Sequence, residues 1–468
     1  MNFSDKIYLF DTYTRNKRIF VPLKPGRVKV YTCGPTVYDN PHIGNLRAYV
    51  FADILRKTFE LNGYEVEHVI NITDVGHLIS DMDEGADKVE TRAREQKRSA
   101  WEIVAFYTKV FKQNFIDLNI KSPTIWSKAT DHIAEQISLI KQLEKAGYIY
   151  KISDGLYFDT AKVVNYGYLA RLDVEGINPG VRVKLSAEKR NPTDFALWKF
   201  SPAGEQRQME WDSPWGIGFP GWHIECSAMA MKYLGETIDI HTGGIDHIPI
   251  HHTNEIAQSE AVTGKQFARY WMHVAFLNVN GAKMAKSDGN FFTLQDLIDK
   301  GYDPFSFRYL LLTAKYRTGL NFTWQSLKGA QEALFSLRSR IAELDEPESI
   351  PDKEIVDDFV RSINDDLNTP QAIALLWKTI GLSMPPAVKR ATFAKFDKVL
   401  GLRLMDVKKS NVPNEVNALI KKRETFRREK KWAEADKVRI ELESKGYKIE
   451  DTKTGSIIKN SAPTSKED

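Results

Sequence analysis

Cysteine is nearly absent from this chain, which has 468 residues but only two cysteines, Cys33 and Cys226. One possible pair cannot hold a chain of this length together, so disulfide-scaffolded secreted folds are excluded. No run of about 18 apolar residues occurs, which argues against a membrane span. The N-terminus also lacks the charged-then-apolar pattern of a signal peptide, and we therefore expect a cytoplasmic protein.

The phosphate-binding pattern G-x-x-x-x-G-K-[ST] is missing too, so the familiar P-loop kinases and ATPases lose support. A G-x-G-x-x-G string does occur at Gly216–Gly221. We expect no strand, turn and helix around it and interpret it as a loop, in which Pro220 would remove a backbone donor from any phosphate cradle.

Net charge is small, at +4, and does not by itself indicate a nucleic-acid-binding protein. The charge is unevenly placed, however, because residues 421–431 read KKRETFRREKK, with seven basic and two acidic side chains. Such a run is usually the solvated face of a helix. It becomes a candidate phosphate contact only if the protein has a polyanionic partner.

A strand, a helix and a second strand follow one another near the N-terminus. Arg27–Cys33 and Glu65–Ile72 read as buried strands. Between them, Leu46, Val50 and Ile54 lie four apart on one helical face. This order favours a βαβ crossover and predicts a doubly wound, Rossmann-like parallel sheet.

The residue pattern changes several times after this unit. Beyond Thr293 it is almost wholly typical of helices. The predicted fold class is α/β: a split doubly wound parallel sheet with an inserted subdomain, followed by an all-α C-terminal half. The predicted segments are the first half of the sheet (1–117), an inserted connective subdomain (118–210), the second half of the sheet (211–292), connecting stem helices (293–345), a helical bundle (346–410), a basic C-terminal end (411–460) and a disordered tail (461–468).

The two cysteines mark a candidate metal site. Cys33 ends the first strand, and Cys226 follows almost two hundred residues later, but the carboxyl ends of parallel strands meet at one edge of a sheet. Six of the ten histidines fall between residues 223 and 273. His251 and Glu255 are four apart and would share one helical face. Two thiolates, an imidazole and a carboxylate make a credible zinc set.

Two alternatives remain open from the residues alone. Free cysteines are often ordinary buried apolar side chains without a metal. His252 and Glu255 are also a workable helical pair, so spacing does not decide between His251 and His252.

Two further strings suit a nucleotide. In Pro41–Asn45, a helix N-terminus offers free N–H groups, Gly44 permits close approach, and His42 and Asn45 can donate to phosphates. A helix cap would explain this string equally well. Downstream, Lys283–Ser287 follows a strand-like run, His273–Val279, and its two lysines suit a pyrophosphate leaving group. A solvated surface turn is the alternative.

The two strings, in this order and at opposite ends of a split sheet, resemble the HIGH and KMSKS signatures of class I aminoacyl-tRNA synthetases. Neighbouring strings are similar to those of the cysteinyl enzymes in that class, and the match extends over nearly the whole chain. The matching strings are Tyr31–Asp39, Gly221–Met229, His251–Ser259, Trp271–His273 and Asp365–Pro370.

The resemblance implies one zinc ion per chain, held by Cys33, Cys226, His251 and Glu255. In these enzymes the sulfur of the substrate cysteine binds the metal. A thiol with a pKa of about 8.5 readily becomes a metal-bound thiolate. The hydroxyl of serine is far less acidic and is a harder donor, so zinc can reject serine without an editing domain.

The resemblance also implies the remaining substrates and contacts. The partners would be L-cysteine, ATP with Mg²⁺, and tRNA(Cys), with residues 411–460 as the anticodon-binding end and no obligatory protein partner or membrane. Thr73 and Trp222 would line the cysteine pocket. The residues implied in ATP binding and catalysis are His42, Gly44, Asn45, Asp246 (at the ribose), Lys283 and Lys286.

Some positions depart from the family pattern. After Asp74, an acidic loop at Asp81–Asp87 replaces the common Val-Asp-Asp-Lys, Ala285 and Thr253 replace a usual Ser and Glu, and the C-terminus lacks a usual Trp. Two rival functions predict different features of the chain. A ligase joining cysteine to an amino sugar should lack the last helical segment, and a degenerate tRNA-binding protein should have broken catalytic strings.

Overall fold

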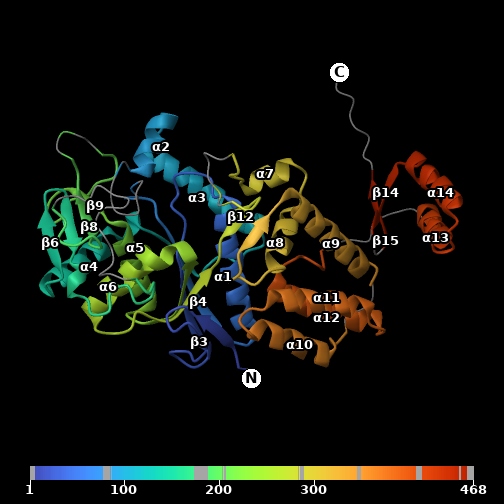
Figure 1. The fold of residues 1–468 in the computed structure, drawn as a ribbon, viewed down its shortest axis with the longest axis horizontal. Coiled ribbons are helices and arrows are strands. Elements are labelled where there is room, and N and C mark those ends of the chain that lie inside the picture. Colours follow the sequence, from blue (N-terminus) through green and yellow to red (C-terminus); the bar gives the residue numbers. More distant parts are fainter. Residues whose placement is uncertain are drawn as a thin grey trace.

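Five parallel strands form the sheet at the centre of the computed structural model, in the order β11-β10-β3-β4-β5 (Figure 1). The middle strand, β3, therefore pairs with one strand from the first part of the chain and one from beyond the insertion. The predicted split, doubly wound sheet is confirmed. Its strands are β3 (Arg27–Thr32), β4 (Glu65–Ile72), β5 (Ile125–Lys128), β10 (Ile238–Gly244) and β11 (Ala268–Val274).

The structure describes residues 6–76, 78, 85, 87–172, 188–202, 204, 207–282, 284, 289–344, 349–406, 414–452 and 455–460. The predicted disordered tail at 461–468 lies outside them, as do residues 346–348 at the start of the predicted helical bundle. None of the described helices is long and apolar enough to cross a membrane. The helices that flank these strands in the sequence are α1 (Ile43–Leu61), α2 (Lys88–Gln96), α3 (Ala100–Asp117), α5 (Trp222–Leu234) and α6 (Thr253–Thr263).

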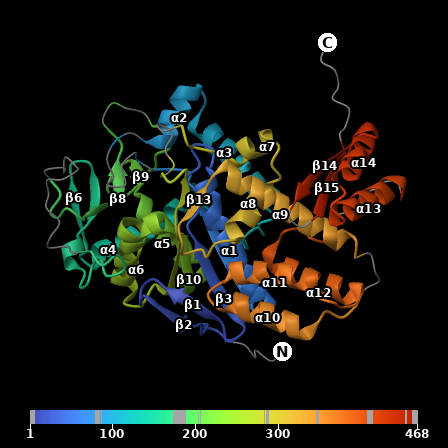
Figure 2. The ribbon, with the colours of Figure 1, turned by 45° about the vertical axis from the view of Figure 1, so that its right-hand side comes forward.

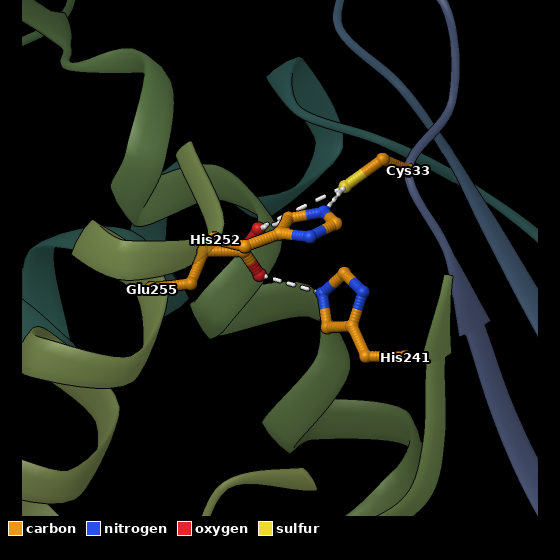
Figure 3. Close-up of side chains that lie close together, drawn as sticks. All are labelled: Cys33, His241, His252 and Glu255. Carbon is orange, nitrogen blue, oxygen red and sulfur yellow. Dashed lines mark hydrogen bonds and ion pairs between the residues drawn. The ribbon is translucent and has the colours of Figure 1, made fainter. Parts of the chain in front are cut away.

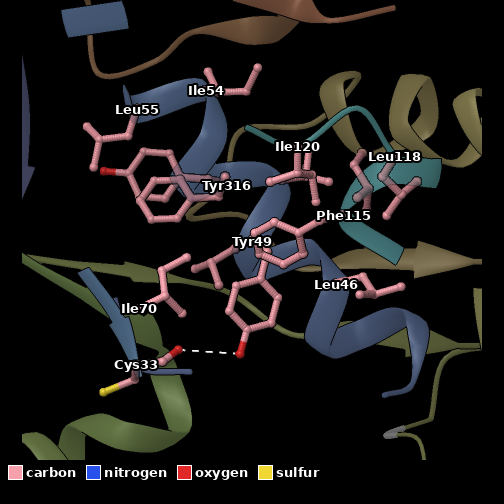
Figure 4. Packing of buried hydrophobic residues seen from close by; sticks show 14 of the residues in the cluster. Cys33, Leu46, Tyr49, Ile54, Leu55, Ile70, Phe115, Leu118, Ile120 and Tyr316 are labelled. Atoms are coloured by element: carbon pink, nitrogen blue, oxygen red, sulfur yellow. Dashed lines mark hydrogen bonds between the residues drawn. The ribbon is translucent and has the colours of Figure 1, made fainter. Parts of the chain in front are cut away.

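Helix α1 packs its apolar face against the sheet, as the spacing of Leu46, Val50 and Ile54 predicts, and all three side chains are buried. Figure 4 shows this packing next to the end of β3. There the hydroxyl of Tyr49, on α1, donates a hydrogen bond to the carbonyl of Cys33 at 3.4 Å. The helix that begins at the first signature string thus supports the strand end that carries a predicted metal ligand.

The insertion forms its own antiparallel sheet, in the order β6-β7-β8-β9, packed on α4 (Ile133–Lys145). Its fourth strand comes from beyond residue 210, where we placed the boundary; the domain boundaries themselves stay predictions. The strands are β6 (Ile149–Ile152), β7 (Gly155–Phe158), β8 (Phe195–Phe200) and β9 (Gly218–Pro220).

Our interpretation of Gly216–Gly221 as a loop is wrong. Part of it forms strand β9, and Gly221 is the N-cap residue of α5. Proline obscured the strand, but β9 lies at the edge of its sheet, where a missing N–H donor is tolerated.

The strand-like run His273–Val279 is likewise not one strand. β11 ends at Val274, and Leu277–Val279 forms a separate strand, β12, which pairs with β13 (Leu320–Phe322). Between the two strands, the guanidinium of Arg47 donates to the carbonyls of Ala275 and Phe276 at 2.9 and 2.6 Å. These bonds hold the backbone out of the central sheet.

The C-terminal half is helical, as predicted, except for β13 and a terminal hairpin of β14 (Tyr447–Thr452) and β15 (Gly455–Asn460). The hairpin and helices α13 and α14 form a separate unit at one end of the molecule (Figures 1 and 2). This C-terminal unit has a small core of its own, which includes Val416, Ile420, Val438, Leu442 and Ile449. The helices are α7 (Leu294–Asp299), α8 (Pro304–Leu312), α9 (Trp324–Ala342), α10 (Lys353–Asn364), α11 (Thr369–Gly381), α12 (Pro386–Leu400), α13 (Asn414–Arg428) and α14 (Trp432–Ser444).

A buried ionic junction joins the sheet domain to the helical bundle. Arg308, on α8, is fully buried and donates to Asp53 on α1 at 2.5 Å and to the carbonyl of Leu400 on α12 at 2.7 Å. Lys57 shares the same carboxylate at 2.7 Å. Burial and the nearby Arg308 lower the pKa of Lys57 to about 8.

Candidate active site and metal centre

Four predicted metal ligands from distant parts of the chain lie together at the carboxyl edge of the sheet. Cys33 follows β3, Cys226 is on α5, His251 is in the short π-helical turn Ile248–His252, and Glu255 is on α6. One ligand atom from each lies within 4.8 Å of all the others. None of the four side chains is more than 5% exposed.

This donor set fits a tightly bound divalent metal. His251 Nε2 and Glu255 Oε1 are 3.0 Å apart, and Cys33 Sγ is 3.7 Å from the same oxygen. Two sulfur, one nitrogen and one oxygen donor, screened from water, match the preferences of zinc. The described residues thus include a buried group that could hold a metal.

The four side chains shift one another's pKa values. Burial raises the pKa of Cys33, and its hydrogen bond to Cys226 retains the proton. Burial also opposes ionisation of Cys226, but the bond from Cys33 and the nearby His251 lower its pKa to about 6. Burial would lower the pKa of His251, yet Glu255 and Cys226 raise it to about 10. A metal ion would displace such protons from its ligands.

A second donor set overlaps the first and shares Cys33 and Glu255 with it, adding His241 and His252 (Figure 3). His252 Nε2 is 3.2 Å from Cys33 Sγ, and His241 Nε2 is 2.8 Å from Glu255 Oε2. Proximity alone therefore leaves the choice between His251 and His252 open. Only the set with His251 includes the second thiol, which zinc favours.

The histidines around the metal ligands are themselves hydrogen-bonded. His252 Nδ1 is 2.7 Å from His273 Nε2, and His273 Nδ1 is 2.8 Å from Thr12 Oγ1. His251 Nδ1 faces His223 Nδ1 at 3.0 Å. Partners of this kind fix the orientation of ligating imidazoles.

The predicted cysteine-pocket residues lie next to the ligands. The indole of Trp222 stacks on His251, with ring centroids 4.2 Å apart. Thr73 is buried, and its hydroxyl donates to Glu225 Oε2 at 2.9 Å and accepts from Asn71 at 3.1 Å. Asn71 also accepts from the backbone N–H of Gly34 at 2.6 Å.

Sequence reasoning missed Glu225 and Asn71 as site residues. Glu225 is fully buried, and burial raises the pKa of its carboxyl group well above the usual value. Its position beside Cys226 could have indicated a role in the site, because a buried acidic residue almost always has a polar or charged partner. Asn71 likewise ends a buried strand at the ligand-binding edge.

The first signature string forms a helix cap. His42 is the N-cap of α1: its Nδ1 accepts from the N–H of Asn45, and the Asn45 side chain accepts from the N–H of His42. Capping and phosphate binding use the same end of the helix, so the cap does not exclude a nucleotide.

The structure brings the two signature strings into contact. A Cβ atom at Gly44 would lie 2.5 Å from Cε of Met284, in the second string, and Ile43 donates its N–H to the carbonyl of Phe292 at 2.8 Å. The predicted lysines, Lys283 and Lys286, lie outside the described residues.

Asp246 is exposed just beyond the carboxyl end of β10, within reach of a ligand at that edge. Of the acidic loop Asp81–Asp87, the structure describes only Gly85 and Asp87. Asp87 caps α2 through the N–H groups of Val89 and Glu90 and pairs with Arg207 at 2.5 Å. This last acidic residue therefore has a structural task, tying α2 to the end of the insertion.

Two family models match the chain. Residues 19–332 match the catalytic domain of class I (C) tRNA synthetases, and residues 409–456 match the cysteinyl-tRNA ligase anticodon-binding domain. Among solved structures, a methionyl-tRNA synthetase of Mycobacterium tuberculosis in complex with methionyl-adenylate shares the fold, at 15% identity and a TM-score of 0.55 over 80% of this chain and 90% of that one. Fold and catalytic-domain match together define a class I aminoacyl-tRNA synthetase.

Curated relatives narrow this class. A cysteine–tRNA ligase of Burkholderia lata is 53% identical over 96% of both chains. Another, from Treponema denticola, is 42% identical over 95% of this chain and 97% of its own. The chain belongs to the cysteine–tRNA ligase family.

Proposed function

We propose that this protein activates L-cysteine with ATP and transfers it to tRNA(Cys), working in the cytoplasm. Family membership supports the ligase activity. The observation that carries the choice of substrate is the buried donor set of Cys33, Cys226, His251 and Glu255 at the ligand-binding edge of the sheet. A pocket made only to bind an aliphatic side chain would have no use for two thiols and a carboxylate.

We propose zinc as the metal, held by these four side chains, where it would bind the substrate as a thiolate and so discriminate against serine. The four ligands come from four segments of the chain and are buried, which would exclude water from the metal. Thr73 and Trp222 would form the wall of the cysteine pocket beside the metal. Thr73 bonds to Glu225, the neighbour of Cys226, and Trp222 stacks on His251.

ATP would bind across the two signature strings. The N-terminus of α1, with His42, Gly44 and Asn45, would receive the phosphates, and Asp246 would hold the ribose. Lys283 and Lys286 would balance the charge that grows on the pyrophosphate, with Mg²⁺ accompanying the nucleotide. The contact between Gly44 and Met284 supports this arrangement, because it places the second string at the helix end.

The reaction would proceed in two steps. The carboxylate of cysteine attacks the α-phosphorus of ATP, forming cysteinyl-adenylate and releasing pyrophosphate. A ribose hydroxyl of the terminal adenosine of tRNA(Cys) then attacks the activated carbonyl, forming the ester and releasing AMP.

The test separates these steps. Cysteine-dependent exchange of pyrophosphate into ATP reports the first, and charging of total tRNA with cysteine reports the second. We expect both, with serine giving no measurable exchange. Exchange without charging would instead favour a ligase that joins cysteine to a small amine. The absence of both reactions would refute the proposal.

A further inference from the structure

Helices α2 and α3 meet at the rim of the candidate active site. Arg92, on α2, pairs with Asp39 at 2.9 Å, and the ammonium of Lys88 lies 5.7 Å from the ring centroid of Tyr38. Tyr38 and Asp39 belong to the loop between Cys33 and His42, which joins the metal site to the predicted phosphate site. Helix α2, which leads into the turn to α3, is therefore anchored to the loop at which both substrates would meet.

Basic side chains gather at this turn. Arg94, Lys97 and Arg98 are exposed and follow one another within five residues. Among the described residues, none of the three forms a hydrogen bond or ion pair with a carboxylate. The nearby acids are already engaged: Glu95 pairs with Arg92 at 3.0 Å, and Glu102 accepts from the N–H and hydroxyl of Ser99 at 2.8 Å each. The hydrogen bonds from Ser99 and the nearby charge of Arg98 lower the pKa of Glu102, so this acid offsets Arg98 in part. The turn keeps a net positive charge through Arg94 and Lys97.

Two exposed aromatic rings stand beside these cations. Trp101 and Phe106, on α3, are 48% and 46% exposed, although apolar rings of this size are usually buried. The guanidinium of Arg98 lies 5.6 Å from the centroid of the Phe106 ring. Trp101 meets Trp211 edge to face, with centroids 6.5 Å apart, so its position is fixed while much of its surface stays open.

We propose that the α2–α3 patch, consisting of Arg94, Lys97, Arg98, Trp101 and Phe106, binds the unpaired 3′ end of tRNA. The inference rests on the proposed function. Cations beside open aromatic faces match a single strand, whose phosphates attract the charges while its unstacked bases stack on the rings. A duplex would offer the phosphates but no free base faces. The 3′ end is also the part of tRNA that must reach the site this patch borders.

In the sequence, the α2–α3 patch comes directly after the segment in which this chain departs from the pattern of the cysteinyl enzymes. The acidic loop Asp81–Asp87 leads directly into α2, and Asp87 fixes the start of that helix. Gln208, at the end of the insertion, accepts from the N–H of Ala100 and donates its own N–H to Glu90, at 2.8 and 2.9 Å. The turn is thereby held rigidly between the insertion and the signature loop.

The experiment compares affinities for tRNA(Cys) with and without its four unpaired 3′ nucleotides. Wild type should bind the intact form more tightly. Trp101→Ala should lose about 5- to 100-fold of affinity for intact tRNA, as expected for one lost stacked base, and almost none for the shortened form. Binding needs neither cysteine nor ATP, so this outcome is independent of whether the proposed reaction occurs.

Matched variants make the result specific. Arg94, Lys97 and Arg98 changed together to Gln should weaken binding of the intact form more than of the shortened one. Lys24→Gln with Lys265→Gln, two exposed lysines near the opposite, amino ends of the strands, should change neither. Trp432→Ala, at a tryptophan that is 59% exposed in the C-terminal unit, should affect both forms equally.

Each contrary result overturns the proposal. If Trp101→Ala retains the wild-type difference between the two forms, the patch does not hold the 3′ end. If the triple Gln variant weakens both forms equally, the cations contact the duplex stem instead. Pyrophosphate exchange at the wild-type rate would verify that each variant is folded.

Discussion

The candidate metal centre and the C-terminal unit differ in almost every physical respect. At this candidate site, no proposed ligand is more than 5% exposed. Cys33, His251 and Glu255 each lie within hydrogen-bonding distance of a histidine from another element. In the C-terminal unit a few apolar side chains form the core, and most of α13 and α14 faces solvent. Bond-making chemistry benefits from desolvated, preorganised groups, whereas attraction of a polyanion needs only accessible cations.

The two regions should therefore fail in different ways when they are altered. Changes at the candidate metal centre should abolish cysteine activation whether or not tRNA is present. Damage to the C-terminal unit should leave activation intact and affect tRNA alone.

The largest effect is expected at the metal centre. Cys226→Ser should lose bound zinc and reduce cysteine-dependent pyrophosphate exchange by at least about 10³-fold, because changes to the partners of metal ligands alone cost about 10- to 100-fold. Elemental analysis of the purified protein would measure the metal. A variant that stays fully active without zinc would show that the four residues do not form the catalytic metal site.

A second effect separates ATP chemistry from cysteine binding. Lys286→Ala should slow adenylate formation by about 10²-fold, because the lysine would stabilise charge that develops only as pyrophosphate leaves. Cysteine affinity should change little. Single-turnover adenylation measures the rate, and an unchanged rate would overturn the role assigned to Lys286.

Removing residues 411–468 should spare pyrophosphate exchange, because every proposed catalytic residue precedes them. Aminoacylation should fall by about 100-fold, mainly through a higher KM for tRNA, which corresponds to about 2.7 kcal/mol of lost binding. Equal charging rates and affinities for the shortened and full-length enzymes would mean that this unit does not recognise tRNA.

A finer change leaves the unit folded. Neutralising Lys421, Arg427, Arg428 and Lys431 together should flatten the salt dependence of tRNA binding, since each phosphate contact contributes about 0.7 to 0.9 to the slope. Titrations between low and moderate salt would show this. A slope equal to that of wild type would identify the run as a solvated helix face, the alternative that composition favours.

A further effect, on stability and not on activity, is expected at the buried junction between the sheet domain and the helical bundle. Lys57 has a pKa of about 8 in the folded protein against 10.5 when unfolded, so between these values the unfolded chain holds more protons. The free energy of unfolding should therefore rise with pH in that window, by up to about 3 kcal/mol relative to Lys57→Met. Denaturant unfolding at pH 7.5 and 10 measures it.

Lys121→Met is the control for this titration, because Lys121 is about half exposed and lies close by. If the stability of wild type and of Lys57→Met rises in parallel with pH, the pH dependence does not come from Lys57.

Much of the central architecture could be predicted from local pattern. The run of buried residues in Glu65–Ile72 and the four-residue spacing along α1 are dictated by which faces meet the core. The grouping of Cys33 with residues beyond position 220 followed from one rule, that parallel strands end at the same edge.

Other features depended on contacts that no local pattern reveals. The strand predicted at His273–Val279 is interrupted by Arg47, a residue more than two hundred positions earlier. β9 escaped notice because its tolerance of Pro220 depends on being at a sheet edge. Glu225 accepts a hydrogen bond from Thr73, 152 positions earlier in the chain, and no local pattern predicts that partner.

The order of the sheet also constrains how the protein folds as it is synthesised. β3 is complete by residue 32, but its neighbour β10 begins only at residue 238. Until that segment leaves the ribosome, the nascent chain carries a parallel sheet with one open edge, a surface that invites pairing with other chains. Most of the core of the insertion lies between residues 133 and 228, so the insertion can fold in large part during this interval. Slow synthesis between residues 72 and 238 should therefore increase the yield of insoluble protein, and a chaperone that covers strand edges should restore it.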